Sequence, residues 1–133
     1  MTFTTALFAF AFIPLLMVGF EITFTYATKG FAYGFSSNRS AAGENSAFMI
    51  RIKRALANTT EAAAYGVPIL AVAALTDLQS ESAELAALLF VIGRAAYTLL
   101  YYSGIPFIRV PAFALGTLSI FYIAYVLGTS GLI

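Results

Sequence analysis

The sequence predicts an all-α membrane protein in which four transmembrane helices form a bundle. Of its 133 residues, 61% are hydrophobic and only 10% are charged, whereas a soluble domain carries about 25% charged residues. A chain this short exposes much of its surface, so a large core cannot account for the excess of apolar residues. Four stretches are long and apolar enough to cross the bilayer. We therefore expect a surface that faces lipid, and one domain over residues 1–133.

The first two predicted helices cover residues 3–27 and 48–75. Only Glu21 interrupts the first stretch, and no Lys or Arg precedes Lys29. The first stretch lacks the basic start of a signal peptide and is longer than its apolar segment, so it is expected to remain as a spanning helix. A polar linker rich in Gly, Ser and Asn joins it to the second helix, whose first half is unusually polar.

The other two predicted helices cover residues 83–102 and 107–127. A short acidic turn, residues 77–81, precedes the third helix. Residues 103–106 read Ser-Gly-Ile-Pro, and Gly followed by Pro is typical of the point where one helix ends and the next begins. Strands are not expected, because an isolated strand cannot satisfy its backbone hydrogen bonds in lipid.

Basic residues gather at two of the three predicted loops. Five flank the first loop: Lys29, Arg39, Arg51, Lys53 and Arg54. Arg109 lies beside the third loop, while the second loop is acidic and the two chain ends carry no Lys or Arg. The positive-inside rule then places loops one and three in the cytoplasm and both termini outside.

Composition excludes several classes of function. A net charge of +1 gives no indication of a nucleic-acid partner. The chain has no cysteine and no histidine, which excludes thiol catalysis by the protein, a histidine base and the commonest zinc ligands. We expect no metal site, and any chemistry must use the remaining polar side chains or come from the substrate.

The second predicted helix carries a polar stripe. Five residues follow the spacing i, i+3, i+7, i+10, i+14: Arg51, Arg54, Asn58, Glu61 and Tyr65. At about 100° per residue they share less than a third of the helix circumference. Polar residues collected on one face of a membrane helix point toward protein or water rather than lipid.

The third predicted helix repeats this pattern with Arg94, Tyr97 and Tyr101, and Arg109 begins the fourth helix at a similar membrane depth. Guanidinium groups bind carboxylates in bidentate fashion. Together with a carboxylate and an amide on the second helix, this set suits a small zwitterion with several carboxylates, such as a tripeptide. The same residues would also serve to hold helices together, and that alternative stays open.

The stretch from Arg51 to Glu61, RIKRALANTTE, resembles the second-helix signature of the MAPEG family, the membrane-associated proteins of eicosanoid and glutathione metabolism. The signature is an arginine, two residues, Arg-Ala, two residues, Asn, two residues and Glu. The third-helix stretch RAAY at residues 94–97, followed by Tyr101, is also similar to the family.

The resemblance implies a homotrimer of four-helix subunits. It also implies a bacterial-type member of the family, located in the inner membrane. Glutathione would bind as co-substrate between neighbouring subunits near the cytoplasmic face. The residues implied in its binding are Arg51, Arg54, Asn58, Glu61, Arg94, Tyr97 and Tyr101. Arg109 lies close to the position of a thiolate-stabilising arginine in eicosanoid-forming members, and the resemblance implies the catalytic role for it.

The leading hypothesis is a glutathione-dependent membrane transferase or peroxidase that acts on lipophilic electrophiles arriving from membrane lipid. The alternative is a non-catalytic membrane protein whose polar stripe serves assembly or binds lipid headgroups or anions. A transporter is disfavoured, because four short helices leave little room for alternating halves unless chains pair. Glu21 is expected to pair either with Arg51 or Arg54 or, as we favour, with another nearby basic side chain in a structural role.

Overall fold

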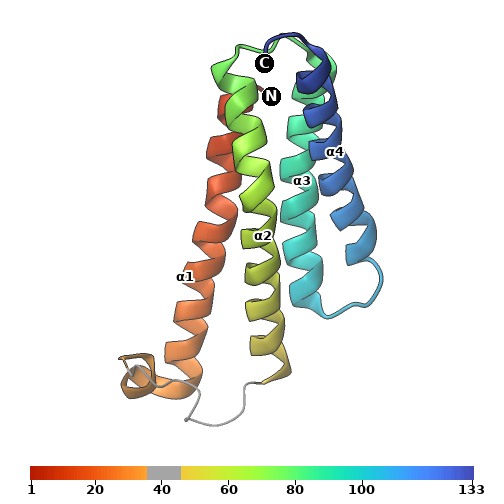
Figure 1. Ribbon diagram of the computed structural model, residues 1–133. Coiled ribbons are helices and arrows are strands. Elements are labelled where there is room, and N and C mark those ends of the chain that lie inside the picture. The colour runs from red at the N-terminus through yellow and green to blue at the C-terminus, as the bar shows by residue number, and fades with distance from the viewer. Residues whose placement is uncertain (36–45) are drawn as a thin grey trace.

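The computed structural model describes residues 1–35 and 46–133, and within these ranges it contains helices and no strand. Figure 1 shows the four helices side by side. They are α1 (Phe3–Phe35), α2 (Ala47–Leu75), α3 (Glu81–Ser103) and α4 (Arg109–Thr129). The predicted all-α fold of four helices is confirmed. Arg39, one of the basic residues of the first predicted loop, lies outside the described residues.

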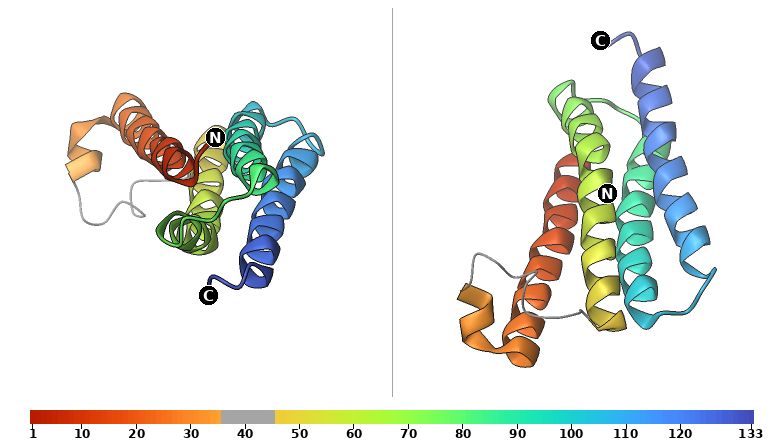
Figure 2. Two further views of the ribbon diagram at one scale, coloured as in Figure 1. Left: turned by 90° about the horizontal axis from the view of Figure 1, so that it is seen from above. Right: turned by 60° about the horizontal axis from the view of Figure 1, so that its bottom comes forward.

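The helices alternate in direction, so their connections fall at two ends of the bundle. Both termini and the α2–α3 turn lie at one end, and the end of α1, the start of α2 and the α3–α4 connection lie toward the other (Figure 1). The views in Figure 2 show the same arrangement, with α1 and α4 on opposite sides. α3 packs mainly on α4 and α1 mainly on α2, and there are no contacts between α1 and α4. This arrangement agrees with an even number of crossings.

Helix α3 begins and ends where its local sequence requires. The Ser80 hydroxyl accepts a hydrogen bond from the Ala83 amide at 3.2 Å, which is an N-cap, and Glu81 and Glu84 in the first turn suit the helix dipole. The helix stops at Gly104, which takes a left-handed conformation with φ 76°. Glycine adopts this conformation without the steric cost of a side chain.

Helices α1 and α4 differ in extent from the sequence prediction. α1 continues to Phe35, with a break at Gly30 (φ 82°), because a helix does not need to stop where its apolar stretch stops. α4 begins at Arg109 rather than at residue 107, because Phe107 has φ 72° and a left-handed residue interrupts a helix. Arg109 is thus the first residue of α4, at the α3–α4 connection.

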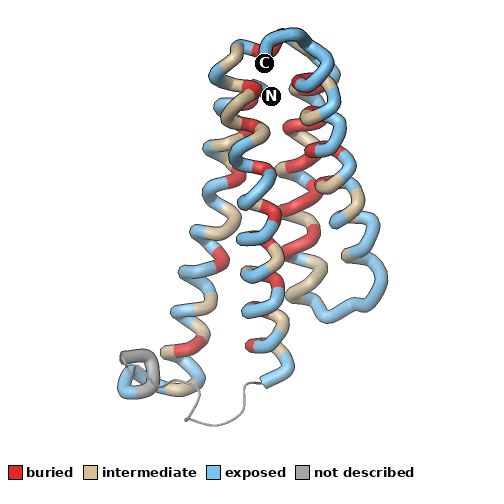
Figure 3. Tube along the Cα trace, in the orientation of Figure 1, coloured by how far each residue is buried: buried red, intermediate tan, exposed pale blue. Residues whose placement is uncertain are grey.

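The buried core lies at the end of the bundle that holds the termini. Phe10 of α1 and Phe90 of α3 are 1% and 0% exposed, and their ring centroids are 5.2 Å apart. Leu70, Ile123 and Leu127 extend this cluster to α2 and α4. Figure 3 shows the buried positions concentrated along the inner faces of the helices.

Three of the helices are long and apolar enough to span a membrane: Phe3–Ala32, Glu81–Ser103 and Arg109–Thr129. Their outward faces carry large apolar side chains such as Phe8, Leu99 and Phe121, which suits lipid as solvent. α2 has 29 residues and runs beside them, but the charged residues in its first half reduce its mean hydropathy. It lies with its polar stretch at the end opposite the core.

Helices α3 and α4 approach closely where Gly93 faces Gly116. A methyl group added at Gly93 would lie 2.8 Å from the Gly116 backbone nitrogen and 3.0 Å from the Ala112 carbonyl oxygen. Small residues allow helix backbones in membranes to come this close. The close approach also fixes Arg94, the next residue along α3, against α4.

We expect Gly93→Ala to lower the midpoint of thermal unfolding of the detergent-solubilised protein. The added methyl meets backbone atoms that cannot move aside, and overpacking of this kind costs about 1–3 kcal/mol. Gly128→Ala is the matched control, because a methyl group there meets nothing within 4 Å. Equal midpoints for the two variants would contradict this description of the α3–α4 contact.

Candidate functional site

Arg94 is the centre of the candidate site. Its side chain is 0% exposed, although α3 is a membrane-spanning helix. Its Nη2 donates hydrogen bonds to Asn58 Oδ1 at 2.8 Å and to Thr59 Oγ1 at 3.2 Å. The guanidinium carbon lies 4.6 Å from the centroid of the Tyr97 ring. Three of the sequence-predicted site residues, Asn58, Arg94 and Tyr97, are therefore brought together.

The Arg94 guanidinium has hydrogen-bonding capacity that the protomer does not use. Its Nε and Nη1 atoms are buried and have no hydrogen-bond partner. Among the described residues, no carboxylate lies within ion-pair distance of it. A buried cation is costly unless it is paired and hydrogen-bonded. The two free donor positions are suited to an anionic or carbonyl oxygen supplied from outside the protomer.

The space around Arg94 depends on α4. A methyl group at Gly116 would lie 3.3 Å from Arg94 Cδ, tighter than ordinary van der Waals contact. Gly116 is itself buried. The small residue on α4 thus leaves room for the aliphatic part of the arginine side chain between the two helices.

Tyr97, Tyr101 and Arg109 form a second group beside Arg94. The rings of Tyr97 and Tyr101 are 5.6 Å apart, and the Arg109 guanidinium lies 4.5 Å from the centroid of the Tyr101 ring. Arg109 is half-buried. Stacking on the electron-rich ring face holds its cation in place, at the end of the bundle opposite the core.

Arg51 has structural partners at the end of α3. Its Nε donates to the Tyr102 carbonyl oxygen at 3.3 Å, and its guanidinium carbon lies 5.4 Å from the Phe48 ring centroid. It also contacts Gly104, where a methyl group would lie 3.1 Å from Arg51 Cζ. A basic side chain on the last carbonyls of a helix is favourable, so Arg51 secures the C-terminus of α3 against α2.

Arg54 and Glu61 are exposed on the surface of the protomer, next to the half-buried Asn58. Neither has a hydrogen bond or ion pair with another described residue, so the two are not paired with each other. The two residues are seven positions apart on one helix, which is about 10 Å along the axis. Charges on a membrane helix face protein or water rather than lipid.

Glu21 pairs with Lys53 instead of with Arg51 or Arg54. The Lys53 Nζ to Glu21 Oε1 distance is 3.3 Å. This ion pair joins α1 to α2, and Lys53 is not one of the polar-stripe positions of α2. The expected structural partnership with a nearby basic side chain is confirmed, with Lys53 as the partner.

Thr59 is a residue of the site that the sequence pattern did not single out. It is 0% exposed and accepts a hydrogen bond from Arg94. It directly follows Asn58 in the sequence but is not one of the five positions of the polar stripe. The available signal was a hydroxyl residue directly after Asn58, on the side of α2 that turns toward α3.

Apart from Arg51, the residues of the candidate site form an inner and an outer group. The inner group is buried or half-buried and consists of Asn58, Thr59, Arg94, Tyr97, Tyr101 and Arg109. The outer group, Arg54 and Glu61, lies on the adjacent outer surface of α2. The inner group offers two cations and aromatic walls to an anion, and the outer group offers one charge of each sign.

Comparison with known proteins supports one family. A model of the MAPEG family matches residues 3–129, nearly the whole chain. No curated protein and no solved structure matches the chain.

Proposed function

The chain belongs to the MAPEG family, whose members include glutathione-dependent transferases as well as non-catalytic proteins, and on this basis we propose that it is a glutathione-dependent transferase or peroxidase for lipophilic electrophiles. It is an integral membrane protein, as its family and its membrane-spanning helices indicate. The observation that carries the proposal is Arg94, a fully buried cation with two unused donors. Glutathione carries two carboxylates, so it brings the anionic oxygens that this position lacks.

The proposed binding roles follow the inner and outer groups. Arg94 and Asn58 bind a carboxylate or backbone oxygen of glutathione in the buried part of the site. Arg54 binds the other carboxylate, and Glu61 binds the ammonium group. Tyr97 and Tyr101 pack against the tripeptide. Arg51 of α2 contributes a positive charge beside the C-terminus of α3. Charge-assisted hydrogen bonds of this kind are roughly twice as strong as hydrogen bonds between neutral groups.

We propose that the site is completed by a second and third copy of the chain in a homotrimer. Exposed Arg54 and Glu61 support this arrangement, because both charges lie on the surface of the protomer and charges on a membrane helix face protein or water rather than lipid. Glutathione bound between copies would neutralise both. The proposed location is a bacterial inner membrane, with the α1–α2 and α3–α4 connections in the cytoplasm and the termini outside.

Arg109 is the proposed catalytic residue. A cysteine-type thiol has a pKa of about 8.5, so only a few per cent of it is thiolate at pH 7. A cation in a partly desolvated site favours the thiolate, and Arg109 is held half-buried on the Tyr101 ring. The thiolate sulfur attacks the electrophilic carbon of a lipophilic substrate, a C–S bond forms, and the leaving group departs with its electron pair. With a hydroperoxide, two glutathione molecules are oxidised to the disulfide while the hydroperoxide is reduced to an alcohol and water.

A non-catalytic role in assembly is the alternative, and two contacts favour it. Arg94 joins α3 to α2 through Asn58 and Thr59. Arg51 secures the end of α3. Both are contacts that a purely structural polar cluster would also make. The two roles differ in what they require of the outer group.

The double variant Arg54→Leu/Glu61→Leu separates the two roles. The proposed function predicts an oligomer of unchanged mass in detergent. Its affinity for glutathione should be at least a hundredfold lower, since two charge-assisted interactions of roughly 2 kcal/mol each are removed. Light scattering after gel filtration gives the mass, and calorimetric titration gives the affinity.

The matched control is Glu21→Leu/Lys53→Leu, which likewise removes one charge of each sign, here from the ion pair between α1 and α2. It is expected to bind glutathione as the unmodified protein does. Loss of the oligomer in the Arg54/Glu61 variant would favour the assembly role and contradict the proposed function.

A further inference from the structure

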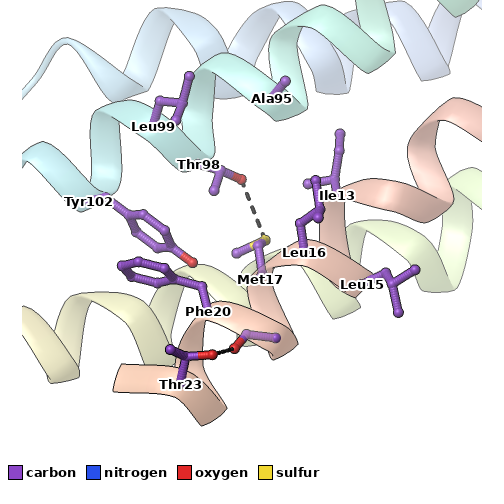
Figure 4. Close-up of a pocket in the computed structure, with 11 residues that line it drawn as sticks. Ile13, Leu15, Leu16, Met17, Phe20, Thr23, Ala95, Thr98, Leu99 and Tyr102 are labelled. Atoms are coloured by element: carbon purple, nitrogen blue, oxygen red, sulfur yellow. Dashed lines mark hydrogen bonds between the residues drawn. The ribbon is translucent and has the colours of Figure 1, made fainter. Parts of the chain in front are cut away.

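An apolar groove runs between α1 and α3. Figure 4 shows the side chains that line it, all from these two helices. Its volume is about 740 Å³, and its walls include Ile13, Leu16, Phe20, Thr98, Leu99 and Tyr102. On α3 these are positions 98, 99 and 102, whereas the candidate site uses positions 94, 97 and 101. The groove is therefore on a different face of α3 from the candidate site.

The groove lies within the membrane-spanning part of both helices. Its α1 wall extends from Ile13 to Thr23, inside the span Phe3–Ala32. At 1.5 Å of rise per residue this wall is about 15 Å long, which is half of the hydrocarbon thickness of about 30 Å. The length of the groove thus matches the thickness of one leaflet.

Tyr102 provides a polar group at one end of the groove. It is the next-to-last residue of α3, and its ring stacks on Phe20 with centroids 5.5 Å apart. Its hydroxyl is buried and has no hydrogen-bond partner. Figure 4 shows this hydroxyl directed across the groove toward Phe20 and Met17.

The other hydroxyl groups of the groove are already satisfied. Thr23 donates to the Gly19 carbonyl oxygen at 2.8 Å, and Thr98 donates to the Arg94 carbonyl oxygen at 3.1 Å. Tyr102 is therefore the lining side chain with a donor left to offer. Tyrosine is enriched at the boundary of the hydrocarbon layer, where its apolar ring faces the chains and its hydroxyl meets polar groups. The polar groups of phospholipids at that depth are ester carbonyls.

We propose that the α1–α3 groove binds one acyl chain of a membrane phospholipid, with the ester carbonyl of that chain accepting a hydrogen bond from the Tyr102 hydroxyl. The chain fills the apolar walls over one leaflet, and the ester lies at the end of α3. This lipid is a resident ligand distinct from the electrophile of the proposed function, since the groove and the candidate site occupy different faces of α3. The proposal does not depend on glutathione.

The first test is photolabelling of the full chain in phosphatidylcholine vesicles, using a phosphatidylcholine with a diazirine in the acyl chain. We expect labelled peptides to concentrate on the groove residues of α1 and α3. Gly19→Leu places a large apolar side chain on the groove wall, at a position where nothing lies within 4 Å of an added Cβ. It is expected to reduce this labelling at least fivefold. The control Gly128→Leu, at an equally open position of α4, leaves it unchanged.

The second test addresses the hydrogen bond. Ester-linked phosphatidylcholine should be retained about fivefold more strongly than its ether-linked analogue, since one neutral hydrogen bond contributes about that factor. Tyr102→Phe removes the hydroxyl while keeping the ring and the main-chain carbonyl that Arg51 contacts. It should abolish the preference for the ester. Lipids retained on the purified protein are measured by native mass spectrometry.

Three results would overturn the proposal. One is labelling spread evenly over the exposed faces of α1 and α4, with no effect of Gly19→Leu. Another is equal retention of ester and ether lipids by the unmodified protein. The third is cross-linking of the groove to a second copy of the chain, together with loss of the oligomer in Gly19→Leu, which would make a protein helix the occupant.

Discussion

Replacing Arg94 with Met is expected to weaken glutathione binding about thirtyfold while leaving the thermal stability of the unliganded protein unchanged or raised. The affinity falls because at least one charge-assisted hydrogen bond, worth roughly 2 kcal/mol, is lost. The stability does not fall because the unliganded protein contains a buried cation with two unused donors. Replacing such a charge by an apolar side chain of similar length is often neutral or stabilising.

This pair of results distinguishes a ligand-binding arginine from a structural one. If Arg94 served only to join α2 to α3, Arg94→Met would lower the unfolding midpoint, and glutathione binding would not be a property of the unmodified protein. Thr59→Val is a useful companion, since it removes the acceptor of one hydrogen bond to Arg94 and keeps the shape of the side chain. The glutathione affinity of Thr59→Val should fall less than that of Arg94→Met. Thr59→Ser keeps the hydroxyl and should bind glutathione as the unmodified protein does.

Arg109→Ala is expected to abolish the thiolate form of bound glutathione near neutral pH. If Arg109 lowers the pKa of the bound thiol by about two units, to roughly 6.5, about three quarters of it is thiolate at pH 7, against about 3% without the shift. The initial rate with an electrophile should then fall roughly 25-fold at pH 7. Ultraviolet thiolate absorbance and the rate of conjugation measure the two effects.

The pH dependence of the conjugation rate tests whether Arg109 lowers the pKa of the bound thiol. A lowered thiol pKa means that the reactive thiolate is already present at neutral pH and is lost only as the pH falls through the lowered value. The rate of the unmodified protein should therefore level off above pH 7. The rate of Arg109→Ala should keep rising toward pH 9 and nearly close the difference. Arg109→Lys keeps a cation and should retain part of the shift. An equal loss of rate at pH 7 and pH 9 in Arg109→Ala would contradict this role.

The helices could be predicted from the sequence because their determinants are local. The start of α3 was predicted at residue 83 and lies at Glu81, where Ser80 provides the cap. The end of α1 was placed too early, at residue 27, because apolar composition marks the edge of the membrane and not the last helical turn. The start of α4 at Arg109 depends on the left-handed Phe107, which the sequence does not make evident.

The partners of the site residues were less predictable than their positions. Periodicity places Arg54, Asn58 and Glu61 on one face of α2, but it does not say which of them meets α3. The rotation of α2 makes Asn58 and Thr59 the inward pair and leaves Arg54 and Glu61 outside. The match of the chain to the MAPEG family confirms the resemblance inferred from the second-helix motif. It leaves the roles of the individual residues as predictions.

The central claim is that this chain binds glutathione at the Arg94 group, and the most direct measurement is calorimetric titration of glutathione into the detergent-purified protein, with ultraviolet absorbance recorded in parallel. We predict saturable binding below millimolar glutathione, a thiolate band at neutral pH, and an affinity about thirtyfold weaker in Arg94→Met. Absence of binding at millimolar glutathione would contradict the proposed function and leave the polar cluster as an element of assembly.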